Sequence, residues 1–598
     1  MFTTEDAKAL IQQNPPSTYT LEAGKSSRKG NVVVFFFFPG KNLVISFDYR
    51  YGTSGFRGDA RTLNSVFVRV GLLGVLRSFE KKGQAVGLMI TASHNPEQDN
   101  GLKIIDPSGE MLHHTWESIA TNVVNMPQDE VLAYLQKKYE ELSDKHAKPT
   151  IFVGRDTRPH SNRFSKLVIR ACASIASPVI IKFFLIHLCM SVRVCVCVCW
   201  ISSSEMLDFG EVTTPQMHYL VRYGNMQDLI ETMKSELYVA AIGTTFLKCL
   251  KLLAHKPTKI KGELIVDCAN GVGGIVLQQV CSLLDDYLAI HLIHLPSSNW
   301  KVNHQCGAEH VQKKHQLPQG LRELQHAGKQ DNTTNWKKSR LASVDGDCDR
   351  LIYYFVDECD QLQILDGDKL MCLLFTCLKR FIHQTNASLT VQYIFLYLCL
   401  YLLLLLLLLL FLFIIYYYYY LLLLLLLFFF LKWTKLIHKV AIIQTAYANG
   451  ASTDYLRRTF EVEPIWTKTG VKYLHLEAVR HDVSVYFEAN GHGTVLINSS
   501  AVRKLQDKLQ SPSCTFQERD AIQMLLLWHD LSNQTIGDAL TDLLLVELSL
   551  HILQWDIAQW NAIYQDRPSQ LTAVQVPDRF VFQTTNAEQT CIKPLGLQ

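Results

Sequence analysis

The chain alternates short apolar runs with stretches in which apolar residues recur at helical spacing. The run Val86–Ile90 predicts a buried strand, and Val66–Phe79 carries its apolar residues in the pattern of a helix. A strand-like run followed by a polar or glycine-rich loop recurs at Gly262–Gly274, Leu341–Asp357, Ala441–Ser452 and Val483–Ile497. This alternation predicts an α/β protein with mostly parallel sheets, in which functional groups gather where strands end.

One apolar segment breaks the alternation. Val391–Leu431 consists largely of blocks of Leu, Ile, Tyr and Phe, and it exceeds the roughly 20 apolar residues that cross a bilayer. A transmembrane helix is therefore one interpretation. However, Ile, Tyr and Leu are encoded by ATT, TAT and TTA, which are the three frames of one DNA repeat. We favour translated non-coding DNA over a membrane span.

Two further segments have unusual composition. Val194–Cys199 alternates Val and Cys, which fits a repeated TG dinucleotide, and Asn31–Ile45 is a weaker candidate of the same kind. We therefore expect spurious inserts at about 178–205 and at about 388–432.

Composition narrows the class of protein. A chain of 598 residues exceeds one ordinary core and predicts about two to four domains. The net charge is +3 without a basic stripe, so we expect no nucleic-acid partner. The polar N-terminus does not resemble a signal or transit peptide, and the 16 cysteines show neither zinc spacing nor a disulfide framework. A cytoplasmic location is expected.

The loop after the first strand-like run places Ser93 beside His94. Two predicted turns and a lysine follow, at Asn95-Pro96, Asn100-Gly101 and Lys103. For an arbitrary Ser-His pair, a surface loop with a capping serine is the better interpretation. The alternative is a nucleophilic serine at the end of a strand with a cation close by.

Three carboxylates alternate within the turn Asp345–Arg350, at Asp345, Asp347 and Asp349. Their oxygens can converge on one point, and hard oxygen ligands suit Mg²⁺ or Ca²⁺ rather than zinc. An EF-hand is excluded because its sixth position would be Arg350 and its twelfth Val356. A solvated acidic turn is the alternative, and we assign Asp366-Gly367-Asp368 to that class.

Mg²⁺ binds proteins through a few carboxylates together with phosphate oxygens. Ser93 would then carry or accept a phosphoryl group, with the aspartates holding the metal on it. Phosphoryl transfer needs in-line positioning and neutralised charge. The available positive groups are Arg57, His94, Lys103 and Arg350.

A third polar loop, Glu488–Thr494, carries the carboxylate of Glu488 and the amide of Asn490, followed by glycines at 491 and 493. Such a pair can bind adjacent sugar hydroxyls. A hairpin turn with Asn490-Gly491 at its tip is the alternative, and from this loop alone we favour the turn.

Taken together, these loops resemble the α-D-phosphohexomutase family. The similar segments follow the family order and are Thr91–Leu112, Val153–Ser161, Thr213–Val221, Val266–Gly274, Asp345–Arg350, Gln444–Thr453, Thr467–His475 and Phe487–Thr494. The resemblance implies a multi-domain α/β architecture with mixed and parallel sheets around a central cleft. The implied domains are 1–210 (phosphoserine), 211–365 (metal-binding), 366–560 (sugar-binding) and 561–598 (the start of a phosphate-binding domain).

The resemblance also implies roles for single residues. Ser93 matches the phosphorylated serine, and one Mg²⁺ per site would be held by its phosphate together with Asp345, Asp347 and Asp349. The implied catalytic group comprises Ser93, His94, Lys103 and Arg57. The implied substrate-binding residues are Arg350, Thr469, Gly470, Lys472, Glu488, Asn490, Gly491 and His492.

The Ala-Asn-Gly-His form of the loop at 489–492 is similar to the N-acetylhexosamine branch of the family. The implied reaction converts N-acetylglucosamine 6-phosphate to the 1-phosphate through a phosphoserine and a bisphosphate intermediate, towards UDP-N-acetylglucosamine. The implied partner is a small sugar phosphate, and the oligomeric state is left open.

Two departures from the family pattern bear on activity. Cys348 stands where the family usually has Ala, which should leave the turn intact. An Arg-Pro-Ser-Gly-Thr phosphate motif is not found, because Arg567–Gln570 lacks its Gly-Thr. We therefore expect a largely missing fourth domain and weak activity. The alternatives are an inactive family member and a membrane-anchored protein that uses 391–431.

Overall fold

The computed structural model describes most of the chain. The described residues are 4–16, 18–21, 33–36, 43–52, 55–142, 147–175, 179–183, 204–227, 233–254, 259–297, 301–327, 339–385, 440–569 and 581–594. Both low-complexity segments, Val194–Cys199 and Val391–Leu431, lie outside these residues. Within the described ranges, every helix is too short or too polar to cross a bilayer.

The first sheet has six strands in the order β4-β6-β5-β7-β9-β8. They are β4 (Phe56–Asp59), β5 (Ala85–Ile90), β6 (Asp99–Ile105), β7 (Thr150–Arg155), β8 (Val179–Phe183) and β9 (Ser204–Glu211). β5, β7, β9 and β8 pair in parallel, whereas β6 pairs antiparallel with both β4 and β5. The helices are α1 (Glu5–Gln13), α2 (Asn64–Glu80), α3 (His114–Asn125), α4 (Val131–Glu140), α5 (Ser161–Ala173) and α6 (Thr214–Gln227).

The central strand β5 is apolar throughout because helices cover both of its faces. Val86, Leu88 and Ile90 belong to the core formed with α2 and α5. Ala85 and Met89, on the opposite face, belong to the core formed with α6. Burial on both faces explains the continuous apolar run in the sequence.

The second sheet has five strands in the order β11-β10-β12-β13-β14. They are β10 (Glu263–Asp267), β11 (Ala289–Ile293), β12 (Arg340–Val344), β13 (Leu351–Val356) and β14 (Leu362–Leu365). β10 pairs in parallel with β11 and β12, whereas β12 and β13 form an antiparallel hairpin whose turn is the acidic loop 345–350. The helices are α7 (Glu236–Leu253), α8 (Gly273–Leu284), α9 (Ala308–Lys314) and α10 (Gln319–Ala327).

The third sheet has four strands in the order β16-β15-β17-β18. They are β15 (Val440–Thr445), β16 (Ile465–Thr467), β17 (Val483–Phe487) and β18 (Gly493–Ile497). The helices are α13 (Gly450–Phe460), α14 (Val471–Ala478), α15 (Ser499–Gln510), α16 (Phe516–Leu531), α17 (Ala539–Leu553) and α18 (Ile557–Asn561), preceded by the helix that starts at Gly367 and is described to 385. The hydrophobic core is shared with the second sheet.

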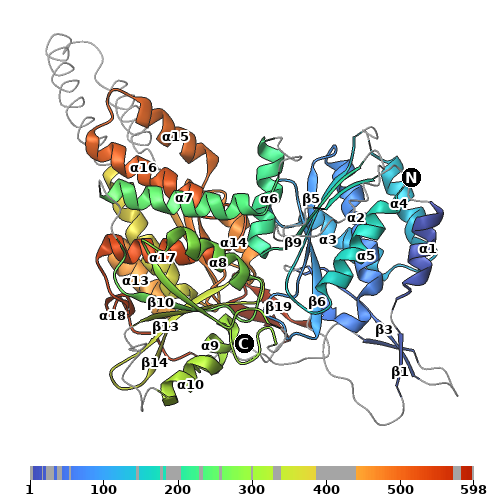
Figure 1. Ribbon diagram of the computed structural model, residues 1–598, viewed down its shortest axis with the longest axis horizontal. Helices are drawn as coiled ribbons and strands as arrows, with labels where there is room; N and C mark the ends of the chain where they lie inside the picture. The colour runs from blue at the N-terminus through green and yellow to red at the C-terminus, as the bar shows by residue number, and fades with distance from the viewer. Residues whose placement is uncertain are drawn as a thin grey trace, which may run out of the picture.

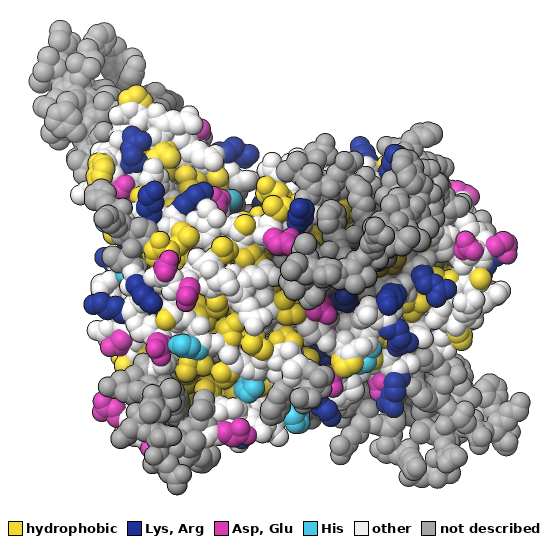
Figure 2. Space-filling view, in the orientation of Figure 1, with side chains coloured by type: hydrophobic (Ala, Val, Ile, Leu, Met, Phe, Trp, Pro, Cys, Tyr) yellow, Lys and Arg dark blue, Asp and Glu magenta, His cyan; other side chains and the backbone are white. Residues whose placement is uncertain are grey.

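Figure 1 shows the first sheet on one side and the second sheet on the other, with α6 between them. In the space-filling view of Figure 2, charged side chains of both signs are scattered over the visible face. The predicted α/β class with mixed and parallel sheets is confirmed. The limits assigned to the four domains stay predictions.

Two smaller antiparallel sheets complete the described structure. One has the order β1-β3-β2, from β1 (Thr18–Leu21), β2 (Val33–Phe36) and β3 (Leu43–Phe47). The segment Asn31–Ile45, considered a possible insert, therefore includes β2 and part of β3. The other is the hairpin of β19 (Gln583–Thr585) and β20 (Thr590–Lys593).

The predicted turn at Asn100-Gly101 is wrong, because both residues lie within β6. Glycine is required at position 101 for close backbone approach. A Cβ there would lie 2.2 Å from the Phe56 carbonyl oxygen and 2.7 Å from that of Thr91. The pair therefore lies where β6 packs closely against the backbone of β4 and of the residue that follows β5.

Replacing Gly101 by Ala should destabilise the first sheet by about 1–3 kcal/mol, because the added methyl meets backbone on two sides. Chemical denaturation followed by circular dichroism measures the change. The control is Gly58→Ala in β4, where the nearest atoms to a new Cβ are side-chain carbons 3.7 Å away. Equal stability of the two variants would contradict the crowding argument.

Candidate active site

Loops from the three large sheets bring the predicted residues together. Ser93 follows β5, the acidic turn joins β12 to β13, and residues 488–492 join β17 to β18. The Ser93 hydroxyl donates to Asp345 Oδ2 at 2.8 Å, across 252 positions of sequence. Leu351 N–H, at the end of the acidic turn, donates to Gly491 O at 3.0 Å. The serine, the acidic turn and the third loop therefore form one site.

Ser93 is fully buried and sits in a left-handed backbone conformation, with φ 51°. Its N–H donates to the Thr91 hydroxyl at 2.9 Å. Such a conformation costs energy in a residue other than glycine, so surrounding contacts must hold it. Asn303 and Arg158 supply them, each donating to the Ser93 carbonyl at 2.8 Å.

Arg158 is the main support of this loop. Its guanidinium also donates to the carbonyls of Asn95 at 2.7 Å, Pro96 at 2.6 Å and Asp99 at 3.0 Å. Asp156 accepts from the same guanidinium at 3.0 Å. Arg158 lies in one of the segments that resemble the family, but its role could not be predicted from the sequence. Its hydrogen bonds join positions that are far apart in the chain.

The three aspartates are buried, and one oxygen from each lies within 4.8 Å of the others. Among the described residues, Asp347 Oδ1 and Asp349 Oδ1 are buried without a hydrogen-bond partner. Buried carboxylate oxygens without partners are costly, and an all-oxygen donor set suits a hard divalent cation. The residues present therefore fit Mg²⁺.

Protein cations already face these carboxylates. Lys103 Nζ lies 3.0 Å from Asp347 Oδ2 and 3.3 Å from Asp349 Oδ2. Burial acts to raise the pKa of Asp349, but the charges of His492, Lys103 and Arg350 outweigh it and hold the pKa below its usual value. Burial and the two neighbouring carboxylates raise the pKa of Asp345.

Arg57 and His94, two further residues predicted to supply positive charge, also lie near the acidic turn. Burial lowers the pKa of Arg57, while the charge of Asp347 opposes that effect. Burial, followed by the charges of Arg350 and Arg57, lowers the pKa of His94 well below 6.5. His94 is therefore neutral at pH 7, and its Nδ1 lies 3.4 Å from Ser93 Oγ.

The third loop is held rigidly against the acidic turn. Glu488 accepts from Gly470 N–H at 3.0 Å and from the Asn490 amide at 3.2 Å. Gly491 has φ 84°, and a Cβ there would lie 2.0 Å from Leu351 O, so no side chain fits. His492 Nδ1 lies 3.9 Å from Asp349 Oδ1.

Two predicted substrate-binding residues make contacts elsewhere. Lys472 donates to the Leu112 carbonyl at 2.6 Å and forms an ion pair with Glu117 of α3, which joins α14 to the first sheet. Thr469 N–H donates to Glu588 of the C-terminal hairpin at 2.9 Å. Their substrate roles stay predictions.

Besides Arg158, two further residues beside the acidic turn and the third loop received no role from the sequence. Thr214, at the start of α6, donates its hydroxyl to Asp347 Oδ2 at 2.6 Å. The Tyr447 hydroxyl accepts from the Asn490 amide at 3.4 Å and is hydrogen-bonded to Glu488. Both belong to segments quoted for the family resemblance, but neither spacing nor composition showed their contacts.

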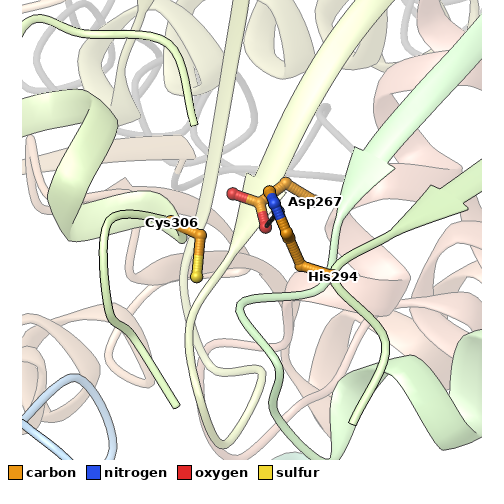
Figure 3. Close-up of side chains that lie close together, drawn as sticks. All are labelled: Asp267, His294 and Cys306. Atoms are coloured by element: carbon orange, nitrogen blue, oxygen red, sulfur yellow. Dashed lines mark hydrogen bonds and ion pairs between the residues drawn. The ribbon is translucent and has the colours of Figure 1, made fainter. Parts of the chain in front are cut away.

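A second group, Asp267, His294 and Cys306, also has potential ligand atoms within 4.8 Å (Figure 3). The Asp267 carboxylate already accepts hydrogen bonds from Ala269 N–H, His294 Nδ1, Gly307 N–H and the Ser343 hydroxyl, at 2.6–3.0 Å. Because its acceptor sites are used, Asp267 is a structural residue rather than a metal ligand. It ties together the segments next to the acidic turn, and we call Asp267 with its hydrogen-bond donors the clamp.

Comparisons with known proteins identify one family. A family model described as "Phosphoacetylglucosamine mutase AMG1, domain III" matches residues 425–555. A second, "Phosphoglucomutase/phosphomannomutase, alpha/beta/alpha domain I", matches residues 41–130. Phosphoacetylglucosamine mutase of Sus scrofa is 34% identical over 558 residues, covering 92% of this chain and 84% of that protein. The Schizosaccharomyces pombe enzyme is also 34% identical, covering 92% and 89%.

Solved structures give the same result. An N-acetylglucosamine-phosphate mutase of the α-D-phosphohexomutase superfamily, in a product complex, superposes with a TM-score of 0.72 at 31% identity, covering 92% of this chain and 86% of that one. The Aspergillus fumigatus N-acetylphosphoglucosamine mutase, in complex with GlcNAc-6P and magnesium, gives 0.70 at 32% identity, covering 94% and 87%.

The fold and the acidic site thus define an enzyme of the α-D-phosphohexomutase superfamily. Within it, the chain belongs to the phosphoacetylglucosamine mutase family. The expectation of a largely missing fourth domain is not confirmed, because the alignments extend over 84–89% of these relatives.

The clamp beneath the acidic turn predicts a pH-dependent stability. Burial acts to lower the pKa of His294, but the hydrogen bond and charge of Asp267 outweigh it and raise the pKa above 6.5. The stabilisation is therefore complete below pH 6.5 and is lost as pH rises through the raised folded-state value.

In His294→Asn, the amide keeps a neutral donor to Asp267 but loses the charge. Its deficit in unfolding free energy should shrink by about 1 kcal/mol between pH 6 and pH 8.5, as measured by urea denaturation. His291→Asn in β11, the strand that ends just before His294, is the control, because its side chain is 59% exposed. A deficit independent of pH would show that the charged pair contributes nothing.

Proposed function

We propose that this chain interconverts N-acetylglucosamine 6-phosphate and N-acetylglucosamine 1-phosphate. The observation that carries the proposal is the bond from the Ser93 hydroxyl to Asp345, beside two buried carboxylate oxygens without hydrogen-bond partners among the described residues. A phosphoryl group on Ser93 would lie next to three aspartates that fit Mg²⁺. The substrates follow the relatives named for this reaction and the solved complex with GlcNAc-6P and magnesium.

One Mg²⁺ would be held by Asp345, Asp347, Asp349 and an oxygen of the Ser93 phosphate. When bound, it neutralises charge on the phosphoryl oxygens. Lys103 contributes a positive charge 3.0 Å from Asp347 Oδ2. The acidic turn can therefore stay close to a phosphate in spite of its own charge.

The first step transfers the phosphoryl group from Ser93 to the free hydroxyl of the sugar phosphate. A bond forms between that hydroxyl oxygen and phosphorus, the bond from phosphorus to Ser93 Oγ breaks, and the hydroxyl proton is passed on to Oγ. His94, neutral and 3.4 Å from Oγ, is the proposed carrier of this proton. Arg57 and Arg350 stabilise the charge on the transferred group.

The resulting bisphosphate then turns over in the site. Ser93 Oγ attacks the other phosphate, the bond from that phosphorus to its sugar oxygen breaks, and the Ser93 hydroxyl proton passes to that oxygen. This step restores phosphoserine and releases the isomeric monophosphate. Glu488 and Asn490 are the proposed partners of the sugar hydroxyls, helped by Gly491 and His492. We retain Thr469, Gly470 and Lys472 as proposed ligands of the distal part of the substrate.

We also propose the domain limits and the cellular location of the chain. The proposed domains are 1–210, 211–365, 366–560 and 561–598, and they follow the family resemblance. A cytoplasmic location fits the free cysteines of the described part of the chain.

Purified protein should carry phosphate on Ser93 after incubation with a hexosamine 1,6-bisphosphate, as detected by phosphopeptide mass spectrometry. Ser93→Ala should lose this phosphate and lower mutase turnover by at least about 10³-fold, because the covalent step has no substitute. Ser118→Ala, on the exposed part of α3, is the control and should keep both. Unchanged turnover in Ser93→Ala would refute the phosphoserine mechanism.

Tyr447→Phe should raise the KM for the sugar phosphate about 2–10-fold, because Glu488 and Asn490 lose a shared hydrogen-bond partner. Phosphorylation of Ser93 should be unaffected. Tyr455→Phe, whose hydroxyl lies 3.3 Å from the Thr376 hydroxyl, is the matched control. If both variants bind substrate like the wild type, Tyr447 does not position the sugar loop.

A further inference from the structure

A small cavity lies behind the acidic turn, on the side of α6. It has a volume of about 20 Å³ and is lined by Lys103, His218, Asp349, Val471, His492 and Ile536, among others. A cavity of this size holds about one water molecule, provided that polar groups face it. The lining comes from all three large sheets or their helices, so the cavity sits where these units meet.

Three buried polar atoms from residues lining this cavity have no hydrogen-bond partner among the described residues. They are His218 Nε2, Asp349 Oδ1 and His492 Nε2. The exposed fractions of the three residues are 1%, 2% and 6%. Buried polar atoms without partners call for an unseen water or ion, and three of them around one cavity share one explanation.

The tautomer of His218 follows from its other nitrogen. His218 Nδ1 lies 2.6 Å from the Gly109 carbonyl oxygen, which only accepts, so Nδ1 carries the proton. Nε2 therefore presents a lone pair to the cavity. Burial lowers the pKa of His218 to about 3, so the ring stays neutral.

We propose that one ordered water occupies this cavity and bridges His218 Nε2 to Asp349 Oδ1, which makes His218 a positioning residue for the metal-binding carboxylate. The water donates one proton to each of these two acceptors. It accepts a hydrogen bond from His492 Nε2–H, because the three donors of Lys103 Nζ already face Thr214, Asp347 and Asp349. Asp349 Oδ1 has two lone pairs, so one remains for the cation.

This inference rests on the proposed role of Asp349 as a Mg²⁺ ligand. It also means that α6 helps to orient the aspartates. Thr214 and His218 are four residues apart on α6, so they share one face of the helix. Thr214 binds Asp347 directly at 2.6 Å. With the bridging water, the same helix face orients two of the three aspartates.

Two substitutions at His218 distinguish loss of the contact with the water from a general loss of stability. His218→Asn keeps a donor near Gly109 O but has no atom at the position of Nε2. His218→Gln places its amide near that position and can still accept from the water. A matched control is His475→Asn, because the buried His475 bonds to the Tyr486 hydroxyl at 3.0 Å through Nδ1 and does not line the cavity.

The test measures Mn²⁺ binding to the full chain by electron paramagnetic resonance, which does not depend on turnover. His218→Asn should weaken binding roughly tenfold, whereas His218→Gln and His475→Asn should stay within about threefold of the wild type. Wild-type affinity in His218→Asn would overturn the inference. A wild-type chain that binds no Mn²⁺ would instead overturn the proposed metal function.

A crystal structure of the wild type provides a test that does not depend on any variant folding. Electron density for a water within about 3.2 Å of both His218 Nε2 and Asp349 Oδ1 would support the bridge. Clear density for the surrounding side chains without such a water would refute it.

Discussion

The structure depends on the convergence of three buried carboxylates within one short turn. Like charges at this depth repel each other and lose their hydration, so they persist only if cations surround them. Lys103 comes from β6, Arg57 from β4 and Arg350 from the turn itself. Two carboxylate oxygens, one each of Asp347 and Asp349, are left without hydrogen bonds in the described structure, and these oxygens suit a divalent ion.

The same constraint explains how the three large sheets fit together. The hairpin β12–β13 supplies the aspartates, the first sheet supplies the serine and the lysine, and α6 anchors Asp347 through Thr214. The loop at 488–492 is tied to the acidic turn through a backbone hydrogen bond that requires glycine at position 491. The proposed sugar-binding loop and the acidic turn are therefore held together by the backbone.

Much of the fold and of the acidic site could be predicted from local sequence. Apolar runs followed by polar loops indicated the strands, and alternating aspartates indicated the acidic turn. The turn predicted at Asn100-Gly101 was wrong, because turn propensity cannot reveal that these residues lie in a strand packed against the backbone of Phe56. Thr214, Tyr447, Arg158 and His218 were missed because their contacts join distant segments, and only the folded chain places them beside the site.

The central claim is that a phosphate on Ser93 shares one divalent cation with the three aspartates. The most direct measurement is ³¹P electron–nuclear double resonance on the phosphorylated chain loaded with Mn²⁺. We predict a phosphorus hyperfine coupling typical of a phosphate oxygen bound to the ion. Bound Mn²⁺ without any phosphorus coupling would contradict the account.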